Sequence, residues 1–274
     1  MTQRSSWQMS QRLKRQVNLN SSMTNCTIGI MGAMPEEIEG VISLLENPER
    51  TVLGKRTYTS GTINGIKTIV VFSRWGKVAA SATAATLIHA FSITELIFTG
   101  VAGAIDPALK IGDVVLAKRL IQHDLDARPL MDRFEIPLLG ITYLECREEN
   151  TLRVKNAIAP LFLNKTLQKS IGDNILKRFA INNPEFYIGD IASGDQFFSA
   201  EAQKLQLSSV LPTVLCVEME GAVVAQVCYE HNLPFIILRT ISDTADENSH
   251  IDFPRFIKQV SSPYAVAIIK KLLG

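Results

Sequence analysis

From Thr27 onward, apolar runs of strand length alternate with longer stretches in which apolar residues recur every three or four positions. The runs predict strands at 27–34, 66–73, 95–101, 113–120, 186–192, 213–219 and 234–240. The longer stretches predict helices at 36–46, 77–91, 150–160, 200–208, 220–231 and 254–272. Several runs are apolar on both faces, as a sheet covered by helices requires. The pattern therefore predicts an α/β fold, a three-layer sandwich with a central twisted β-sheet flanked by helices.

A hairpin signal makes the predicted sheet a mixed one. Ile63-Asn64-Gly65 separates the segments 56–62 and 66–73, and Asn-Gly favours a tight turn between antiparallel strands. A chain of 274 residues with 46% hydrophobic residues is long enough for one large α/β domain, which we expect to span 24–274.

Residues 1–23 differ from this body, because they hold four basic residues, no acid and many Ser, Gln and Asn residues. Such a composition predicts a disordered basic tail. Met23 stands directly before the first predicted strand, so 1–23 is alternatively a mis-assigned start, or a segment that mimics a transit peptide. It lacks the apolar stretch of a secretory signal.

The net charge, the histidines and the cysteines indicate which kinds of ligand and which cellular compartment suit this chain. A net charge of +1 predicts no nucleic-acid or membrane partner and fits a small uncharged or zwitterionic ligand. The four histidines are scattered singly and predict no metal site, and no motif calls for a cofactor. The four cysteines form no CxxC pair, which indicates a reducing, cytoplasmic compartment.

Four predicted strands end in polar residues where the apolar run stops. They are 32–37 with Glu36 and Glu37, 193–198 with two adjacent phenylalanines, 217–220, and 239–243. Each has a structural alternative: an acidic first helical turn, a simple turn with core phenylalanines, an exposed helix start, or an N-cap. Because ligands of open α/β sheets bind at the carboxyl ends of strands, four acid-bearing ends in one chain indicate a shared crevice.

The acids at 217–220 are the hardest to explain as surface residues. Glu218 and Glu220 interrupt an otherwise apolar stretch, and an extended backbone points both to one side. Burial of an unpaired charge costs several kcal/mol, so these acids should meet donors or ligand hydroxyls. Several carboxylates without a metal or nucleophile suit glycoside cleavage, in which one acid assists the leaving group and another activates water.

At these residues the sequence resembles the methylthioadenosine/S-adenosylhomocysteine nucleosidases of the purine nucleoside phosphorylase-like superfamily. The likeness covers about residues 27–270, in seven motifs in the family's order. These are Ile28-Gly29-Ile30-Met31-Gly32-Ala33-Met34 with Glu37, Gly76-Lys77-Val78-Ala79-Ala80, Thr99-Gly100-Val101-Ala102-Gly103, Ile111-Gly112-Asp113-Val114-Val115, Ser193-Gly194-Asp195, Val217-Glu218-Met219-Glu220 and Ser242-Asp243-Thr244-Ala245-Asp246.

The resemblance implies a nucleoside phosphorylase-like fold and hydrolysis of the N-glycosidic bond in methylthioadenosine and S-adenosylhomocysteine, with roles in methionine salvage and methyl-cycle recycling. It implies that Glu37 is the base that activates water and that Asp243, placed by Ser242, is the acid at purine N7. It implies that Glu220 holds the ribose hydroxyls while Met219 packs against the sugar. Residue type alone suggests that Glu218 and Arg239 form a supporting pair.

The resemblance also places residues around the purine and the 5′ group. Phe197 would stack on the purine, and the backbone of Phe198 would hydrogen-bond the adenine edge. Met34 and Phe253 would line an apolar slot for the 5′-alkylthio group. Part of that slot would come from a neighbouring subunit through the loop 126–137, which implies a homodimer.

Two departures from the family concern the 5′ end. Val101 stands where relatives commonly have serine, and the loop 125–140 is more charged than an apolar slot suggests. These departures leave the 5′ substituent open, so a futalosine-type nucleosidase is an alternative. A purine nucleoside phosphorylase, which shares the fold but passes the ribosyl group to phosphate, is a second alternative, and a catalytically idle adenosine-binding module is a third. A dinucleotide-binding Rossmann domain is excluded, because Gly29 and Gly32 do not complete a GxGxxG fingerprint.

Overall fold

The computed structural model describes residues 26–243 and 253–274, so the predicted tail at 1–23 lies outside the described residues. The strands are β1 (Thr27–Gly32), β2 (Glu46–Leu53), β3 (Arg56–Ile63), β4 (Ile66–Phe72), β5 (Glu95–Ala104), β6 (Val114–Gln122), β7 (Leu144–Glu145), β8 (Phe186–Ser193), β9 (Val214–Glu218) and β10 (Phe235–Asp243). The helices are α2 (Pro35–Ile42), α3 (Lys77–Phe91), α4 (Glu148–Leu163), α5 (Thr166–Ile171), α6 (Asp173–Arg178), α7 (Glu201–Val210), α8 (Gly221–Glu230), α9 (Phe253–Phe256), the π-helical turn η1 (Ile257–Ser261) and α10 (Ser262–Leu272).

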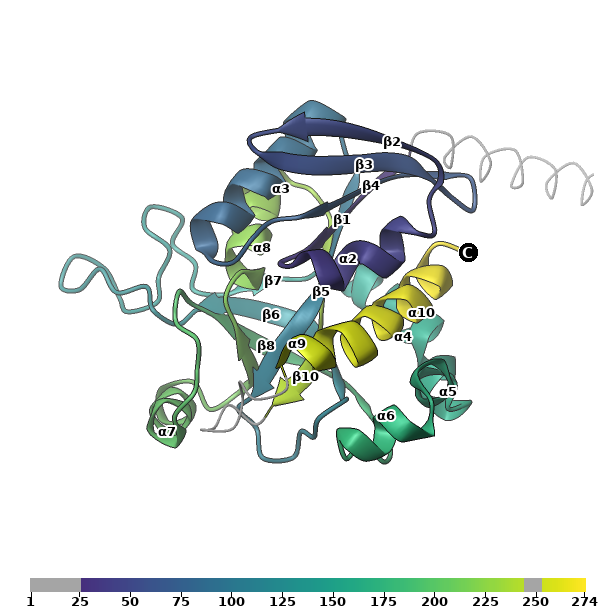
Figure 1. Ribbon diagram of the computed structural model, residues 1–274. Helices are drawn as coiled ribbons and strands as arrows, with labels where there is room; N and C mark the ends of the chain where they lie inside the picture. Colours follow the sequence, from purple (N-terminus) through teal and green to yellow (C-terminus); the bar gives the residue numbers. More distant parts are fainter. Residues whose placement is uncertain (1–25, 244–252) are drawn as a thin grey trace, which may run out of the picture.

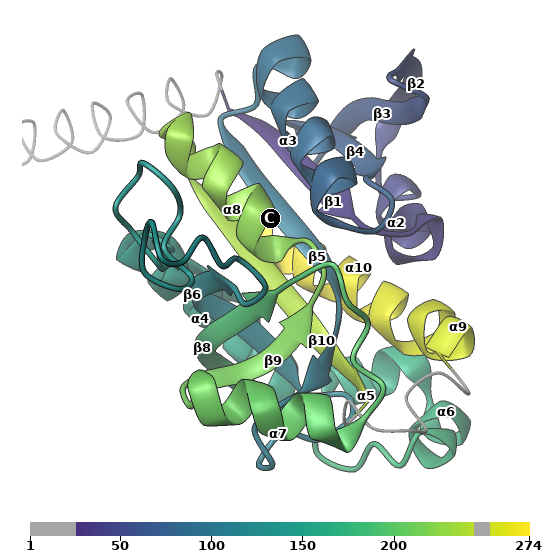
Figure 2. The ribbon, with the colours of Figure 1, turned by 90° about the vertical axis from the view of Figure 1, so that its left-hand side faces the viewer.

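Helices cover both faces of one mixed sheet, as predicted (Figures 1 and 2). The helices α3 and α8 pack on one face, where Leu87 and Val224 join the first core cluster. The helices α2, α4 and α10 pack on the other, where Ile38, Ile158 and Tyr264 join the second. The described residues contain no helix that is both long and apolar enough to cross a bilayer.

The order of the strands is β10-β6-β8-β9-β5-β1-β4-β3-β2, and β10 also pairs with β5. Strands β5, β10, β6, β8 and β9 therefore form a closed ring, from which β1, β4, β3 and β2 extend as an open wing. The hairpin of β3 and β4 is antiparallel, as the Asn-Gly turn predicted. The ring closure was not predicted, because strand pairing does not follow from the apolar runs.

Strand β5 changes its neighbour along one edge. Its first half pairs in parallel with β1 as far as Phe98, whereas its end pairs antiparallel with β9 from Gly103. On its other edge β5 pairs with β10 through nearly its whole length. Between Phe98 and Gly103, neither β1 nor β9 is hydrogen-bonded to β5, and the sheet opens there.

The predicted element boundaries fail mainly at exposed segments. The helix expected at 36–46 ends at Ile42, and 46–53 is the fully exposed edge strand β2, which shows no apolar periodicity. The short helices α5 and α6 were also missed, since six residues carry too little pattern for a helix. The strand expected at 213–219 ends at Glu218, so Met219 and Glu220 lie in a bend.

Candidate active site

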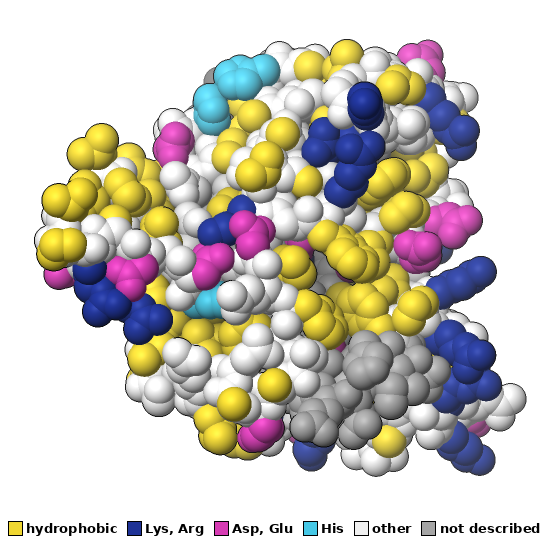
Figure 3. Space-filling model, turned by 60° about the vertical axis from the view of Figure 1, so that its left-hand side comes forward, with side chains coloured by type: hydrophobic (Ala, Val, Ile, Leu, Met, Phe, Trp, Pro, Cys, Tyr) yellow, Lys and Arg dark blue, Asp and Glu magenta, His cyan; other side chains and the backbone are white. Residues whose placement is uncertain are grey.

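A cavity of about 360 Å³ lies where the sheet opens beside β5. The strand residues Gly100, Val101 and Ala102 form its wall, and the carboxyl ends of β1, β9 and β10 converge on it. Figure 3 shows hydrophobic side chains gathered around a hollow on this side of the molecule. The eleven residues assigned a catalytic or substrate-binding role from the sequence all line this one cavity: Met34, Glu37, Phe197, Phe198, Glu218, Met219, Glu220, Arg239, Ser242, Asp243 and Phe253.

Glu37 enters the cavity from the first turn of α2. Helix α2 begins at Pro35, shortly after β1 ends. This short turn from strand to helix places the Glu37 carboxyl group next to the part of β5 that contains Gly100. The backbone N–H groups of Ala33 and Met34 donate to its Oε2 at 2.6 and 3.0 Å. The other oxygen lies against Gly100, where a Cβ atom would come within 2.9 Å of Oε1. A glycine in β5 therefore provides the room for this carboxyl group.

Burial sets the protonation of Glu37. Its side chain is 2% exposed, and desolvation raises its pKa to about 7, partly opposed by the nearby Arg239 guanidinium and by backbone N–H donors. A carboxyl group with a pKa near neutrality can release or take up a proton in the physiological range. Such a group is suited to general base catalysis.

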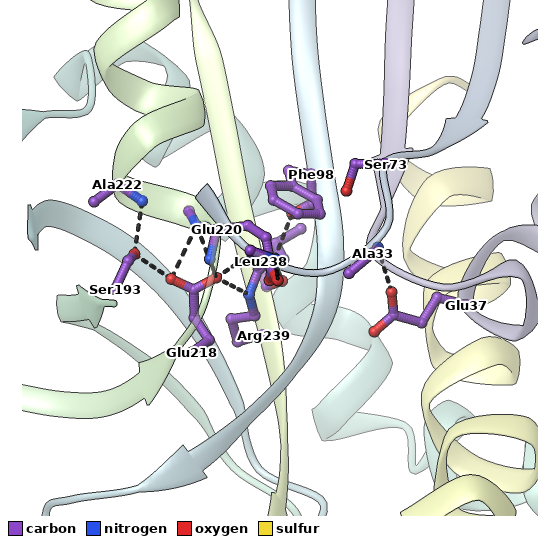
Figure 4. Close-up of polar contacts among 12 residues, drawn as sticks. Ala33, Glu37, Ser73, Phe98, Ser193, Glu218, Glu220, Ala222, Leu238 and Arg239 are labelled. Carbon is purple, nitrogen blue, oxygen red and sulfur yellow. Dashed lines mark hydrogen bonds and ion pairs between the residues drawn. The ribbon is translucent and has the colours of Figure 1, made fainter. Parts of the chain in front are cut away.

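Glu218 and Arg239 form a buried ion pair, which agrees with the pairing suggested from residue type. The guanidinium Nη2 lies 2.7 Å from Glu218 Oε2, and Arg239 is only 1% exposed. Its Nη1 donates to the carbonyl oxygen atoms of Phe98 and Leu238, and its guanidinium lies over the Phe98 ring. Figure 4 shows this pair beside β5, with Glu37 approaching from α2. The pair fixes β10 against β9 and β5 at the cavity.

Glu218 also caps helix α8. Its carboxylate accepts hydrogen bonds from the backbone N–H groups of Glu220 and Gly221. It also accepts one from the Ser193 hydroxyl, which in turn accepts one from the N–H of Ala222 (Figure 4). An acid at the first turn of a helix is stabilised by the helix dipole. The hydrogen-bonding capacity of the Glu218 carboxylate is thus used by donors from the protein, and its role in the site is to hold the start of α8 and Arg239 in place.

Glu220 faces the cavity with fewer partners. The chain turns at Met219, so Glu218 and Glu220 reach the cavity through this bend and not through the extended backbone that the sequence predicted. Gly76 donates its N–H to Glu220 Oε1 at 2.8 Å. Burial and the neighbouring Glu218 raise the pKa of Glu220 to about 8. Hydroxyl donors or a positive charge in the cavity would favour its ionised form.

Asp243 ends β10 and lines the same cavity. The register of β10 against β5 shifts between Ile241 and Asp243, and the hydroxyl of Ser242 donates to Asp243 Oδ2 at 2.6 Å. The cavity thus brings together acids from three of the four strand ends chosen by sequence: Glu37, Glu220 with Glu218, and Asp243.

The fourth strand end contributes aromatic residues but not its acid. Asp195 turns away from the cavity lining, is half exposed, and accepts the backbone N–H of Lys77 at 2.9 Å. Phe197 and Phe198 line the cavity instead, and the Phe197 ring meets the Phe253 ring edge-on at 6.0 Å. The expectation that an acid from this segment joins the crevice was wrong, because Asp195 hydrogen-bonds the first turn of α3.

Several lining residues were not identified from the sequence. Trp75, 62% exposed, lies at the cavity, as do Gln196 and Pro254. Trp75 comes shortly after the end of β4. Because ligands bind at the carboxyl ends of strands, its position in the sequence could have identified it as a site residue. Gln196 and Pro254 lie beside chosen residues and had no separate signal.

Known proteins resemble this chain over most of its length. Residues 27–274 match the family model described as the phosphorylase superfamily. A 5′-methylthioadenosine/S-adenosylhomocysteine nucleosidase of Shewanella frigidimarina is 31% identical, over 89% of this chain and 98% of the relative. An aminodeoxyfutalosine nucleosidase of Helicobacter pylori is 34% identical, again over 89% and 98%.

Solved structures agree with these relatives. The 5′-methylthioadenosine/S-adenosylhomocysteine nucleosidase of S. pneumoniae, solved with a transition-state inhibitor, superposes with a TM-score of 0.75 at 30% identity. The match covers 90% of this chain and 98% of that one. The predicted nucleoside phosphorylase-like fold is therefore confirmed, with its mixed sheet between two layers of helices.

Proposed function

This chain belongs to the phosphorylase superfamily, and we propose that it hydrolyses the N-glycosidic bond of adenine nucleosides with a 5′-thio substituent, such as 5′-methylthioadenosine and S-adenosylhomocysteine. The Shewanella frigidimarina and Helicobacter pylori relatives are both nucleosidases, which supports nucleoside hydrolysis as the reaction class. The observation that carries the proposal is the buried Glu37 carboxyl group, held by two N–H donors at a cavity that also contains Glu220 and Asp243.

In this proposal Glu37 takes a proton from a water molecule whose oxygen attacks the anomeric carbon of the ribose. The bond between that carbon and purine N9 breaks, and its electrons go to the purine. Asp243, oriented by Ser242, gives a proton to N7, so that neutral adenine leaves. Glu220 accepts hydrogen bonds from the ribose hydroxyls, and its charge favours the cationic sugar of the transition state.

The aromatic residues of the cavity suit the purine. Phe197 is 44% exposed, which leaves its ring face available for a base to stack on, whereas Phe198 is buried against the His123 ring. In the proposal the Phe198 backbone hydrogen-bonds the adenine edge. Met34 and Phe253 stand at the end of the cavity that we assign to the 5′ group, and Met219 packs against the sugar.

Water, and not phosphate, is the proposed acceptor of the sugar. A phosphate site is built from several cationic side chains or backbone N–H donors close to the sugar. Among the described residues that line the cavity, the only Lys or Arg is Arg239, and Glu218 already engages it. Lys77 lies 2.7 Å from Asp124 and is not part of the lining. The segment 244–252 contains neither Lys nor Arg.

Adenine release from methylthioadenosine is therefore expected to proceed at the same rate with and without phosphate. The measurement is adenine formation by chromatography in phosphate-free buffer and at increasing phosphate concentrations. Inosine in parallel is a control for the purine, and we expect it to be cleaved slowly. Strict dependence on phosphate would instead identify a phosphorylase, and rapid inosine cleavage would contradict the assignment to adenine.

A nucleosidase acting on aminodeoxyfutalosine is the second candidate. The specific observation in its favour is the 34% identity to the Helicobacter pylori relative of that name, which exceeds the 31% identity to the Shewanella frigidimarina relative. The adenine and ribose ends of the proposed site are the same for either substrate. The choice between them depends on the 5′ end, where Val101 and the loop 125–140 depart from the expected pattern.

A homodimer is proposed on the basis of a projecting loop that carries exposed leucine side chains. The loop between β6 and β7 extends from the body of the protein (Figure 1), and it carries Leu130 and Leu138 with 87% and 91% of their surface exposed. Large apolar side chains this exposed favour burial against a partner. Sedimentation is expected to give twice the mass of the chain, and Leu138→Asp to shift it toward the monomer. A monomeric wild type at micromolar concentration would refute the proposal.

A further inference from the structure

A second hollow of about 550 Å³ opens beside the cavity of the candidate active site. The two share Met34, Trp75 and Phe253, together with Ala33 and Pro254, so they are continuous at the end assigned to the 5′ group. A substituent that leaves the ribose between Met34 and Phe253 would enter this hollow. Its size exceeds what a single methylthio group would fill.

The walls of the hollow are apolar and its charges are few. Pro35, Phe72 and Ile257 line it together with the shared residues. Among the described residues that line it, Arg74 and Glu36 are the only charged ones. They come from different elements, since Arg74 follows β4 and Glu36 lies in the first turn of α2. One cation and one anion thus stand at the same apolar hollow.

The turn that carries Arg74 is conformationally constrained. Arg74 has a positive φ of 74°, which is uncommon for any residue other than glycine. Its Nη2 donates to the carbonyl oxygen of Lys55 at 2.7 Å, which uses one of the five N–H groups of the guanidinium. Two residues later, the N–H of Gly76 binds Glu220. One turn therefore contains both Arg74, which lines the second hollow, and Gly76, which hydrogen-bonds Glu220, the residue proposed to bind the ribose hydroxyls.

We propose that Arg74 and Glu36 are specificity-determining residues that select a zwitterionic 5′ substituent. The apolar stem of the substituent packs against Trp75 and Met34, its carboxylate pairs with Arg74, and its ammonium group pairs with Glu36. This inference rests on the proposed function and narrows it. It makes S-adenosylhomocysteine, whose 5′ arm ends in an amino acid, the preferred substrate over methylthioadenosine.

The three nucleosides named by the relatives differ in the charges of the 5′ arm. Methylthioadenosine ends in a neutral methyl group, aminodeoxyfutalosine carries an aromatic carboxylate without an ammonium group, and S-adenosylhomocysteine carries both charges. The pair of Arg74 and Glu36 complements only the last of them. Glu36 would repel the lone carboxylate of the second.

The test measures kcat/KM for adenine release from all three nucleosides by the wild type, Arg74→Gln and Glu36→Gln. Each variant is expected to lower kcat/KM for S-adenosylhomocysteine, relative to that for methylthioadenosine, by about two- to fivefold, the usual range for one exposed ion pair. Arg74→Gln should also lower the value for aminodeoxyfutalosine, whereas Glu36→Gln should raise it. Arg50→Gln and Glu39→Gln, exposed residues of β2 and α2, are matched controls for the loss of each charge.

The outcomes separate this inference from the proposed function. If the wild type releases adenine from none of the three nucleosides, the proposed function fails. If it releases adenine but both variants change all three values by the same factor, or change none, only the inference is overturned. A wild type that prefers aminodeoxyfutalosine also overturns it, since the hollow would then serve an anionic arm.

Discussion

Replacing Glu37 by glutamine is expected to abolish adenine release and, at the same time, to make the folded protein more stable at pH 8. The activity falls because the amide cannot take a proton from water, and loss of a general base costs about 10²–10⁴-fold in rate. In the wild type, kcat/KM should decline as the pH falls below about 7, where the Glu37 carboxylate takes up its proton.

The gain in stability follows from the raised pKa. In the unfolded chain Glu37 ionises near 4.5, whereas in the folded protein its pKa is about 7. The favourable contribution of the protonated group is complete below pH 4.5 and is lost as the pH rises toward 7. A pKa difference of this size corresponds to about 3 kcal/mol as an upper bound, and Glu37→Gln retains part of it because the amide stays neutral.

Urea unfolding at pH 5 and pH 8, together with an adenine-release assay, tests both expectations. The difference in unfolding free energy between Glu37→Gln and the wild type should be larger at pH 8 than at pH 5. Glu39→Gln alters an exposed carboxylate of the same helix and should change neither property. Full activity of Glu37→Gln would rule out its proposed role, and equal stability differences at the two pH values would rule out the raised pKa.

Replacing Arg239 by methionine should destabilise the protein by about 3–5 kcal/mol at pH 7. The substitution leaves the Glu218 carboxylate buried near Glu220 and Glu37 without its cation. It also leaves the carbonyl groups of Phe98 and Leu238 without their guanidinium donor. Urea unfolding at pH 7 measures the loss.

A second substitution identifies the cause of this loss. Arg239→Met combined with Glu218→Gln removes the uncompensated charge and should recover part of the stability, although the amide cannot replace every hydrogen bond of the carboxylate. Arg128→Met, which breaks the exposed pair with Asp126, serves as a control and should change the stability by less than about 1 kcal/mol. If the double variant is less stable than Arg239→Met, the buried charge is not the reason for the loss.

The sequence predicted the layers of the fold and most of the cavity because both depend on short-range pattern. Apolar runs identify buried strands, and polar residues after them identify the carboxyl edge where ligands bind. Glu37, Glu218 and Asp243 all followed from this rule combined with the family resemblance. The structure brings these side chains to one cavity, and their catalytic roles stay predictions.

The features that could not be predicted from the sequence depend on which strands pair and on the direction in which side chains point. Asp195 follows a strand as Glu37 does, but it bonds to the start of α3 and leaves the cavity lining. Strand β2 is exposed along its whole length, so no apolar pattern marks it. The change of partner along β5 is a property of three strands together, and local periodicity contains no information about it.

The closed ring and the open wing of the sheet supply different parts of the cavity. Glu37 comes from the wing side, after β1, whereas Glu218, Glu220 and Asp243 come from strands of the ring, more than 180 residues later in the chain. Contacts between such distant segments carry a large loop-closure cost, because a long intervening stretch of chain loses freedom when they form. No contiguous fragment of either part contains the full set of carboxylates, so enzymatic activity reports on completion of the whole fold.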